Sequence, residues 1–380
     1  MNNTLVLSEV FPPQRGGSGK WLWEIYKRLD NLNFAMAVGN GFGELEGERS
    51  YPHPIERLPL SMPRRSVANL SSLYHYTRQA RLVSKVVRRH EVTMIHAARP
   101  LSEGLLALAM KLRYGMPYVC YTHGEDISVA MTSRELQYVT SRVLAASKAI
   151  IANSTFTAAL LQSDWSIDAA KIKLMHPGVD TTYFQPAQPQ RQPQWANRFV
   201  ILTVGRLQPR KGYDTVIRAI PHLVDNFPNL LYVIAGGGEY ASQLKELVAE
   251  LGIQQHVAFL GEISDDELLK CYQECDVFVL ANRTIGNDVE GFGIVLLEAQ
   301  ACEKPVVAGK SGGTKDTMQH EKSGFLIDAT SPDELVSVLK TKLATPDLRS
   351  QMGRAGREFV VRQYDWASLS RRASELFQSF

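Results

Sequence analysis

The sequence of 380 residues is long enough for two domains, each with its own buried core. Hydrophobic residues make up 44% and charged residues 21%, and no run of about 18 apolar residues occurs, which excludes a membrane-spanning helix. The four cysteines form no CxxC motif and no regular framework, which excludes a disulfide scaffold. Because residues 1–12 also lack the features of a secretory signal, we expect a cytoplasmic protein.

Charge is divided unevenly along the chain, although the net charge is only +3. Residues 1–193 carry 22 Lys and Arg against 15 Asp and Glu, whereas the remaining residues carry 20 against 24. This excess of positive charge predicts that the first half meets an anionic partner. Ordinary variation between two domain surfaces is the alternative, and the location of the charges must decide between them.

The first half begins with an expected strand at residues 5–7 and an expected helix at residues 19–29. Between them, the turn PPQRGGSGK places Gly16 and Gly17 where glycine backbone can approach a ligand closely. The turn is not a strict GxGxxG motif, so a flexible surface turn is the alternative. Further strands are expected at residues 94–96, 118–121 and 149–152.

A basic segment lies within this half. Residues 57–89 contain eight Lys or Arg and no Asp or Glu. Helical spacing places five of these cations on one face and Leu82, Val83, Val86 and Val87 largely on the other; the five are Arg78, Arg81, Lys85, Arg88 and Arg89. This pattern predicts contact with anionic lipid headgroups, and a merely solvated face is the alternative. Too few aromatic residues are interleaved with the charges to favour nucleic acid.

One histidine follows a strand in the first half. The segment THGEDI, residues 122–127, comes directly after the strand expected at 118–121. Ligands of open parallel sheets bind beyond the carboxyl ends of the strands, so His123 is a candidate to hydrogen-bond a ligand. A single histidine is often structural, and that alternative remains open.

Residues 188–198, QPQRQPQWANR, are rich in proline and glutamine and predict a linker between domains. After them, short apolar strands alternate with helices, which is typical of a parallel sheet covered on both faces. These strands are expected at 199–204, 231–235, 257–260, 277–281, 305–308 and 325–327. We therefore predict an α/β fold with domains at 1–190 and 195–363, and a helix at about 364–380 that packs back on the first domain.

The segment VGRLQPRKG, residues 204–212, brings three cations to the end of a strand, just before a helix. They are Arg206, Arg210 and Lys211. Crowded cations repel one another unless an anion neutralises them, and a helix N-terminus adds further positive potential. The segment predicts a diphosphate site, and a solvated basic turn is the alternative.

The segment DVEGFGIVLLEAQAC, residues 288–302, carries two carboxylates around a glycine-rich junction. Glu290 precedes the junction, and Glu298 is the one charged residue of an otherwise apolar helix. A carboxylate in such a helix is costly unless a donor satisfies it, and ligand hydroxyl groups would serve. A structural carboxylate paired with Lys or Arg is the alternative.

These two segments resemble the retaining glycosyltransferases of family 4, which have the GT-B fold. The longer segment ANRTIGNDVEGFGIVLLEAQACEKPVVAGKSGGTKDTM is similar to phosphatidylinositol mannosyltransferases. The resemblance covers the second half strongly and the first half at a few points. It implies two Rossmann-like domains whose parallel sheets face a deep inter-domain cleft, with the donor held mainly by the second domain and the acceptor by the first.

The resemblance also implies roles for individual residues. At the donor diphosphate we expect Gly16, Gly17, Arg206 and Lys211. At the donor sugar we expect Glu290, Gly291, Phe292 and Gly293. Glu298 would hold the ribose hydroxyls. The residues expected to act in catalysis are His123, Glu290, Arg206 and Lys211.

A further glycine cluster, GGGEY at residues 236–240, follows the strand at 231–235. It lacks the GxGxxG spacing, and no acidic residue ends the next strand, which disfavours a dinucleotide-dependent oxidoreductase. We expect this cluster and the end of the next strand to line the nucleoside pocket, through Gly236, Gly237, Leu260, Gly261 and Ile263.

No DxD motif and no His/Cys cluster with metal-ligand spacing appears, so we expect neither a metal nor a cofactor. The extended match favours transfer of mannose from GDP-mannose to a lipid-linked or glycan hydroxyl, as in glycolipid or polysaccharide biosynthesis. UDP-glucose or UDP-N-acetylglucosamine is the alternative donor. A non-catalytic nucleotide-sugar sensor is the alternative of another class, which the presence of Glu290 and His123 disfavours. Lipid contact would place the protein peripherally on the inner face of the plasma membrane, without nucleic acid as a partner.

Overall fold

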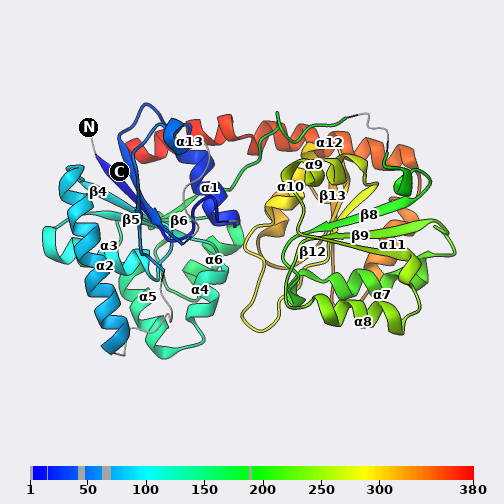
Figure 1. Cartoon of the computed structure of the whole chain (residues 1–380), viewed down its shortest axis with the longest axis horizontal. Coiled ribbons are helices and arrows are strands. Elements are labelled where there is room, and N and C mark those ends of the chain that lie inside the picture. The colour runs from blue at the N-terminus through cyan, green and yellow to red at the C-terminus, as the bar shows by residue number, and fades with distance from the viewer. Residues whose placement is uncertain (1–2, 15, 42–47, 62–69, 188–190) are drawn as a thin grey trace. The chain divides into compact units, whose positions relative to one another are not determined.

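The computed structural model describes residues 3–14, 16–41, 48–61, 70–187 and 191–380 (Figure 1). The chain forms two compact units. Unit 1 comprises residues 1–177 and 366–380, and unit 2 comprises residues 178–365. The chain therefore crosses from one unit to the other twice.

The described residues of unit 1 form a seven-stranded sheet in which all neighbouring strands run parallel. The spatial order is β3-β2-β1-β4-β5-β6-β7. The strands are β1 (Thr4–Ser8), β2 (Phe34–Gly39), β3 (Ile55–Leu58), β4 (Met94–Ala97), β5 (Tyr118–Thr122), β6 (Ala149–Ala152) and β7 (Ile172–Leu174). Most of these strands are fully buried, as expected for a sheet covered on both faces.

Helices cover both faces of this sheet (Figure 1). One face packs against α2 (Leu70–Arg89), α3 (Glu103–Tyr114), α4 (Glu125–Ala130), α5 (Arg134–Ala146) and α6 (Thr155–Ser163). The other face packs against α1 (Gly17–Tyr26) and α13 (Trp366–Gln378). The last helix of the chain thus completes the core of unit 1.

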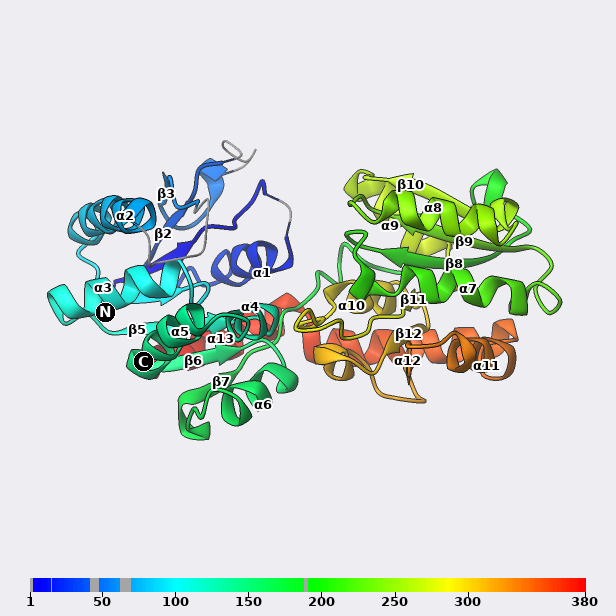
Figure 2. The ribbon, with the colours of Figure 1, turned by 90° about the horizontal axis from the view of Figure 1, so that it is seen from below.

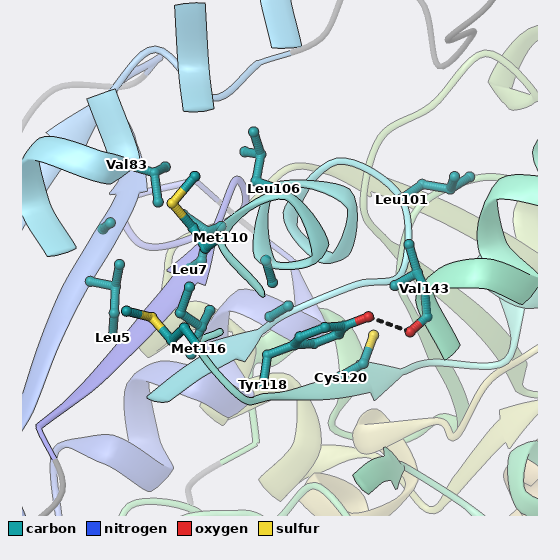
Figure 3. Close-up of a cluster of buried hydrophobic side chains, with 14 of the residues drawn as sticks. Leu5, Leu7, Val83, Leu101, Leu106, Met110, Met116, Tyr118, Cys120 and Val143 are labelled. Atoms are coloured by element: carbon teal, nitrogen blue, oxygen red, sulfur yellow. Dashed lines mark hydrogen bonds between the residues drawn. The ribbon is translucent and has the colours of Figure 1, made fainter. Parts of the chain in front are cut away.

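The alternation of side chains along each strand divides the core into two layers. Leu5 and Leu7 belong to the cluster under α2 and α3, whereas Val6 belongs to the cluster under α1 and α13. Figure 3 shows the first cluster, in which the buried Tyr118 hydroxyl donates a hydrogen bond to the Val143 carbonyl oxygen at 2.5 Å. This bond satisfies the polar atom of an otherwise apolar layer.

The described residues of unit 2 form a six-stranded parallel sheet in the order β10-β9-β8-β11-β12-β13. The strands are β8 (Phe199–Val204), β9 (Leu230–Ala235), β10 (Val257–Gly261), β11 (Val277–Leu280), β12 (Val306–Gly309) and β13 (Gly324–Ile327). Counted within the unit, this order is 3-2-1-4-5-6, the order of a Rossmann fold. Both units are therefore Rossmann-like, as predicted.

Two helical layers cover the sheet of unit 2 (Figure 1). One layer contains α7 (Tyr213–Leu223), α8 (Ala241–Glu250) and α11 (Asp333–Thr341); the other contains α9 (Asp265–Glu274), α10 (Ile294–Ala301) and α12 (Pro346–Tyr364). A capping box begins α9, because the Ser264 hydroxyl and the Glu267 carboxylate each accept from the other's backbone N–H.

The described part of the segment expected as a linker, residues 191–198, packs against unit 2. The crossing lies between residues 177 and 178, where Val179 N donates to the Tyr364 carbonyl oxygen at 2.9 Å. Arg191 pairs with Asp276 at 2.8 Å, and the Trp195 side chain is buried. Residues 188–190 lie outside the described part of the chain. The polar composition of this segment therefore does not mark the crossing between the units. A few side chains, among them Arg191 and Trp195, attach the segment to unit 2.

Candidate functional site

The carboxyl edge of the unit 2 sheet carries the expected donor-binding cations. Gly205 directly follows β8, and the 3-10 helix η4 (Pro209–Lys211) brings Lys211 back beside it. A β-carbon added at Gly205 would lie 3.9 Å from the Lys211 Nζ atom. The loop that follows β11 leads to Glu290 at the same edge, because these strands are parallel neighbours.

Two cations hold the Glu290 side chain. Arg210 Nη1 donates to Glu290 Oε2 at 2.7 Å, and Lys211 Nζ donates to the same oxygen. Arg210 also lies with its Nε atom 2.8 Å from Asp288 Oδ1. Burial alone would raise the pKa of Glu290, but the charges of Lys211 and Arg210 outweigh burial and lower this pKa to about 2. Glu290 is therefore ionised throughout the neutral range.

This pairing corrects the expectation that the crowded cations need a ligand anion. The protein's own carboxylates neutralise Arg210 and Lys211, since a buried carboxylate is costly without a cation beside it. Arg206 is exposed and has no side-chain partner among the residues that the structure describes. Of the two cations expected at the diphosphate, Arg206 is thus open to a ligand, and Lys211 is engaged with Glu290.

Close backbone packing fixes the position of Glu290. A β-carbon at Gly312 would lie 1.9 Å from the Glu290 carbonyl oxygen, and one at Gly212 would lie 1.7 Å from the carbonyl oxygen of Ala281. Both glycines have a positive φ, +68° and +71° respectively. Gly313 N also donates to the Glu290 carbonyl oxygen at 2.9 Å. The Glu290 backbone therefore has little freedom to shift.

The expected sugar-binding glycines lie between Glu290 and α10. Gly293 has a φ of +94° and caps the start of α10 without a side-chain hydrogen bond. The Phe292 ring is buried in the unit 2 core, so its backbone is the part next to the helix N-terminus. Gly291 is half-buried. Backbone N–H groups at the start of a helix have no partner inside the helix, so this segment could offer them to a ligand.

Glu298 lies on the buried side of α10, with 5% of its surface exposed. Its Oε2 atom accepts a hydrogen bond from the Tyr272 hydroxyl at 2.8 Å. Burial and the neighbouring Glu298 charge raise the pKa of Tyr272 well above its usual value, which keeps the phenol as a donor. One partner of Glu298 is thus a phenol from α9, which neither of the interpretations from the sequence named.

The expected nucleoside residues gather at the ends of β8, β9 and β10. Gly236 N donates to the Gly261 carbonyl oxygen at 2.7 Å, and the Gly237 carbonyl oxygen accepts from Leu207 N at 2.9 Å. A β-carbon at Gly236 would lie 2.1 Å from the Gly205 carbonyl oxygen. The half-buried side chains of Leu260 and Ile263 pack against the unit 2 core beside them.

In unit 1, Gly16 and Gly17 lie at the exposed N-terminus of α1. Gly16 is the N-cap residue, and no side chain caps the helix. The backbone N–H groups of the first turn have no partner inside the helix, so this end can accept an anion.

His123 directly follows β5 and is half-buried. Its Nε2 atom lies 2.8 Å from the Ala98 carbonyl oxygen, so Nε2 carries the proton and Nδ1 is the acceptor in the neutral ring. The Trp21 ring contacts it edge-on at 5.5 Å between centroids. Burial lowers the pKa of His123, although Asp126 opposes this effect. The histidine is therefore a neutral, oriented group at a strand end.

Comparisons with known proteins identify the family of the chain. Residues 15–183 match the model of Glycosyltransferase Family 4, and residues 185–359 match that of Glycosyl transferases group 1. A GDP-mannose-dependent alpha-(1-6)-phosphatidylinositol monomannoside mannosyltransferase of Mycobacterium tuberculosis is 31% identical, over 100% of this chain and 98% of that protein. The chain belongs to glycosyltransferase family 4.

Other similar proteins support this glycosyltransferase assignment. A GDP-mannose-dependent monoacylated alpha-(1-6)-phosphatidylinositol monomannoside mannosyltransferase of Corynebacterium glutamicum is 28% identical, over 99% of this chain and 98% of that one. Among solved structures, the glycosyltransferase superposes on Anabaena HepE in complex with UDP with a TM-score of 0.82 at 22% identity, both chains being fully covered. Sucrose-phosphate synthase of Thermosynechococcus elongatus gives 0.84 at 21% identity, over 100% of this chain and 99% of that one. These likenesses show that the fold is GT-B.

The expected basic face of the glycosyltransferase lies on α2, at the β3 edge of the unit 1 sheet (Figure 2). All five expected cations are exposed, but Arg89 pairs with Glu56 at 2.7 Å and Arg88 donates to the Ser84 carbonyl oxygen at 3.3 Å. The first turns of the helix also expose apolar side chains, namely Leu70, Leu73 and Tyr74. Residues 62–69, which hold two more cations of the basic segment, lie outside the described residues. None of the described helices is long and apolar enough to span a bilayer.

The sequence interpretation missed two buried groups of the glycosyltransferase. Arg210 is recognised only as part of a basic turn, although it is almost fully buried between two carboxylates. In unit 1, Glu103 is buried at the start of α3, and its Oε1 atom accepts from Glu9 N at 2.8 Å. The available signal for Glu103 was a charged residue that opens an apolar helix.

Proposed function

We propose that this glycosyltransferase moves mannose from GDP-mannose to a hydroxyl of a lipid-linked or glycan acceptor, with retention of the anomeric configuration. The observation that carries the proposal is the cluster of Arg206, Lys211 and Glu290 at one sheet edge, in a chain that is 31% identical over its whole length to a GDP-mannose-dependent enzyme. A cationic strand end next to an ionised carboxylate suits a nucleotide diphosphate joined to a sugar.

The chemistry follows from the charge that develops on the leaving group. As the bond to the sugar breaks, negative charge accumulates on the diphosphate, and Arg206 and Lys211 stabilise it. Gly16 and Gly17 contribute backbone N–H groups to the same donor during turnover. Because these groups supply positive potential, we propose that the reaction needs no metal ion.

The sugar requires a separate set of contacts. Oε2 of Glu290 accepts from two cations, whereas Oε1 accepts no hydrogen bond from the described residues. We assign Oε1 to a sugar hydroxyl, together with the backbone at Gly291–Gly293 and Nδ1 of His123. Glu298 holds the ribose. In a reaction on one face of the sugar, the leaving phosphate takes the proton of the acceptor hydroxyl.

A UDP-sugar is the rival donor, because HepE, which shares the fold, was solved in complexes with UDP and with UDP-glucose. Thermal-shift titration with GDP, UDP and ADP, without metal, separates the donors. A nucleotide at 100 times its dissociation constant should stabilise the protein by about 2.7 kcal/mol, a shift of a few degrees. Stabilisation by UDP and not by GDP would overturn the mannose assignment.

Product analysis tests the proposed retention, the independence of metal and the transfer reaction itself. With GDP-mannose and mannolipid acceptors, we expect an α-linked product and full activity in excess EDTA. Inversion of the anomeric centre would contradict the proposed retention. Activity that is lost in EDTA and restored only by added magnesium would contradict the proposed independence of metal. Nucleotide-sugar binding without transfer to any acceptor and without hydrolysis would indicate a sensor.

The exposed face of α2 supports a second element of the proposal. Arg78, Arg81 and Lys85 continue the helix beyond the exposed Leu70 and Leu73, so apolar and cationic groups lie together on one described element. Apolar side chains enter the headgroup region while cations attract anionic lipid. We propose that this face docks the enzyme peripherally on a cytoplasmic membrane surface.

A further inference from the structure

Arg210 differs from the other cations of its turn in burial and in the number of carboxylates that it contacts. Only 5% of its side chain is exposed, against 12% for Lys211, and Arg206 is exposed. It pairs through Nε with Asp288 and through Nη1 with Glu290. Because Arg210 makes two charge-assisted contacts to the loop that carries Asp288 and Glu290, it is held there more firmly than Lys211, which makes one.

The Arg210 backbone is tied to the same part of the fold. Its carbonyl oxygen accepts from Arg283 N at 2.8 Å, and Arg283 itself donates to Asp214 and Thr215 on α7. The loop from residue 283 to residue 290 is thus attached to Arg210 at both ends. Lys211 has a single ion-pair partner among the described residues, Glu290, and lies beside the strand end where a diphosphate is expected.

We propose that Arg210 is a positioning residue, which keeps Glu290 ionised and in place while Lys211 turns from Glu290 to the donor diphosphate. The proposal rests on the proposed function, since it requires a diphosphate at Lys211. Glu290 then retains one buried cation at Oε2 in every state, and its Oε1 atom stays directed at the sugar. Asp288 keeps the Arg210 guanidinium from following the phosphate.

The charged and titratable groups that face Glu290 are few. Lys211 and Arg210 approach it from η4, Tyr213 of α7 lies close enough for the Glu290 charge to raise its pKa, and Asp288 acts through Arg210. Removal of Arg210 would leave Glu290 with Lys211 alone. The pKa of Glu290 should then rise, most of all when Lys211 is bound to phosphate.

Three variants test the proposal: Arg210→Met, Arg210→Lys and Lys211→Met. We expect Arg210→Met to bind GDP, or UDP if the protein prefers it, within about threefold of wild type, while Lys211→Met binds at least about tenfold more weakly. In Arg210→Met, kcat should fall, and its acid limb should move to higher pH by at least about one unit. In Arg210→Lys, the acid limb of the kcat–pH profile should return most of the way to its wild-type position, because this variant keeps the positive charge.

Two outcomes would overturn the proposal. If Arg210→Met weakens nucleotide binding as much as Lys211→Met, Arg210 is a phosphate ligand. If the kcat–pH profile of Arg210→Met superimposes on that of wild type, Arg210 has no influence on Glu290. Should Arg210→Met fail to fold, Arg210→Lys should still fold, because it keeps a cation beside Glu290 and Asp288, and failure of Arg210→Lys to fold would also contradict the proposal.

A measurement without donor separates this proposal from the proposed function. The pKa of Glu290 is lowered from 4.5 to about 2, so its contribution to stability is present above pH 4.5 and is lost as the pH falls towards 2. Acid unfolding of Arg210→Met should therefore begin at higher pH than in wild type. If wild type transfers no sugar from any nucleotide, the proposed function fails, and this acid shift still decides whether Arg210 controls Glu290.

Discussion

Two buried carboxylates, Glu103 and Glu290, lie at the carboxyl edges of the two sheets. Their surroundings shift their pKa values in opposite directions. Glu103 of unit 1 accepts from the Glu9 backbone N–H, and burial raises its pKa to about 7. Glu290 of unit 2 is also buried, yet Lys211 and Arg210 lower its pKa to about 2. Nearby Arg99 opposes the burial of Glu103 only in part. Direct ion pairs, more than burial, decide the charge state of a carboxylate at such an edge.

The comparison assigns different tasks to the two residues. Glu290 keeps its charge at every neutral pH, and its Oε1 atom accepts no hydrogen bond from the described residues, which leaves this atom available to a ligand. Glu103 has an Oε2 atom that is buried and without a hydrogen-bond partner among the described residues, and it ties two loops of unit 1 together. The Glu9 contact gives Glu103 a structural task within unit 1.

The largest effect is expected from Glu290→Gln. The change leaves the Lys211 ammonium buried without its counter-ion, and loss of one partner of a buried ion pair costs about 3–5 kcal/mol. Chemical unfolding should show this loss, and transfer activity should disappear. Glu246→Gln on the exposed face of α8 is the matched control and should change stability by less than about 0.5 kcal/mol. Equal stability of Glu290→Gln and wild type would mean that the ion pairs contribute nothing net.

The second prediction concerns Glu103, whose contribution to stability is lost as the pH rises, whereas that of Glu290 is lost as the pH falls. Its pKa rises from 4.5 to about 7 in the folded state, so its contribution is fully present below pH 4.5 and is lost as the pH rises through 7. Glu103→Gln keeps an oxygen for the Glu9 N–H and cannot ionise. At pH 8 it should be more stable than wild type by up to about 3 kcal/mol, and near pH 4 the difference should vanish.

Denaturant unfolding at several pH values measures this effect, with Glu375→Gln on the exposed face of α13 as the control. A difference between Glu103→Gln and wild type that does not change with pH would show that Glu103 ionises normally. The contrast with Glu290 would then be lost.

The sequence predicts the strands of unit 2 better than those of unit 1. The strands of unit 2 are short apolar runs between clear turns, and the expected strand at residues 199–204 matches β8. In unit 1, β2, β3 and β7 were not predicted. β7 has three residues, and β3 has two consecutive charged residues, Glu56 and Arg57, in its middle, so neither gives a strong apolar run.

The sequence names the residues of the candidate site but does not predict how they pair. The GRLQPRKG and EGFG segments identify Lys211 and Glu290, yet 79 positions separate the two residues in the chain. Only the parallel sheet brings their strand ends together, and a list of motifs does not show which cation faces which carboxylate. The Tyr272 partner of Glu298 was missed for the same reason, since it lies on another helix.

Arg206→Met should separate ligand binding from stability within unit 2. The Arg206 side chain is exposed and has no partner among the described residues, so its removal should change stability by less than about 0.5 kcal/mol. A lost charge-assisted contact to phosphate is worth about 1.5–3 kcal/mol, so the donor nucleotide should bind at least about tenfold more weakly. Calorimetric titration measures this, and unchanged affinity would place the phosphates elsewhere.

The smallest effect is expected on the exposed face of α2, where it tests whether unit 1 has a task of its own. Arg81 is exposed, and each Lys or Arg near an anionic surface contributes about 1 kcal/mol, so Arg81→Gln should weaken sedimentation with phosphatidylserine vesicles about fivefold at low salt. Nucleotide binding by unit 2 should not change. Arg218→Gln removes an exposed cation of α7 and should leave vesicle binding intact. If both variants weaken vesicle binding equally, net charge alone attracts the protein, and the face of α2 has no specific role.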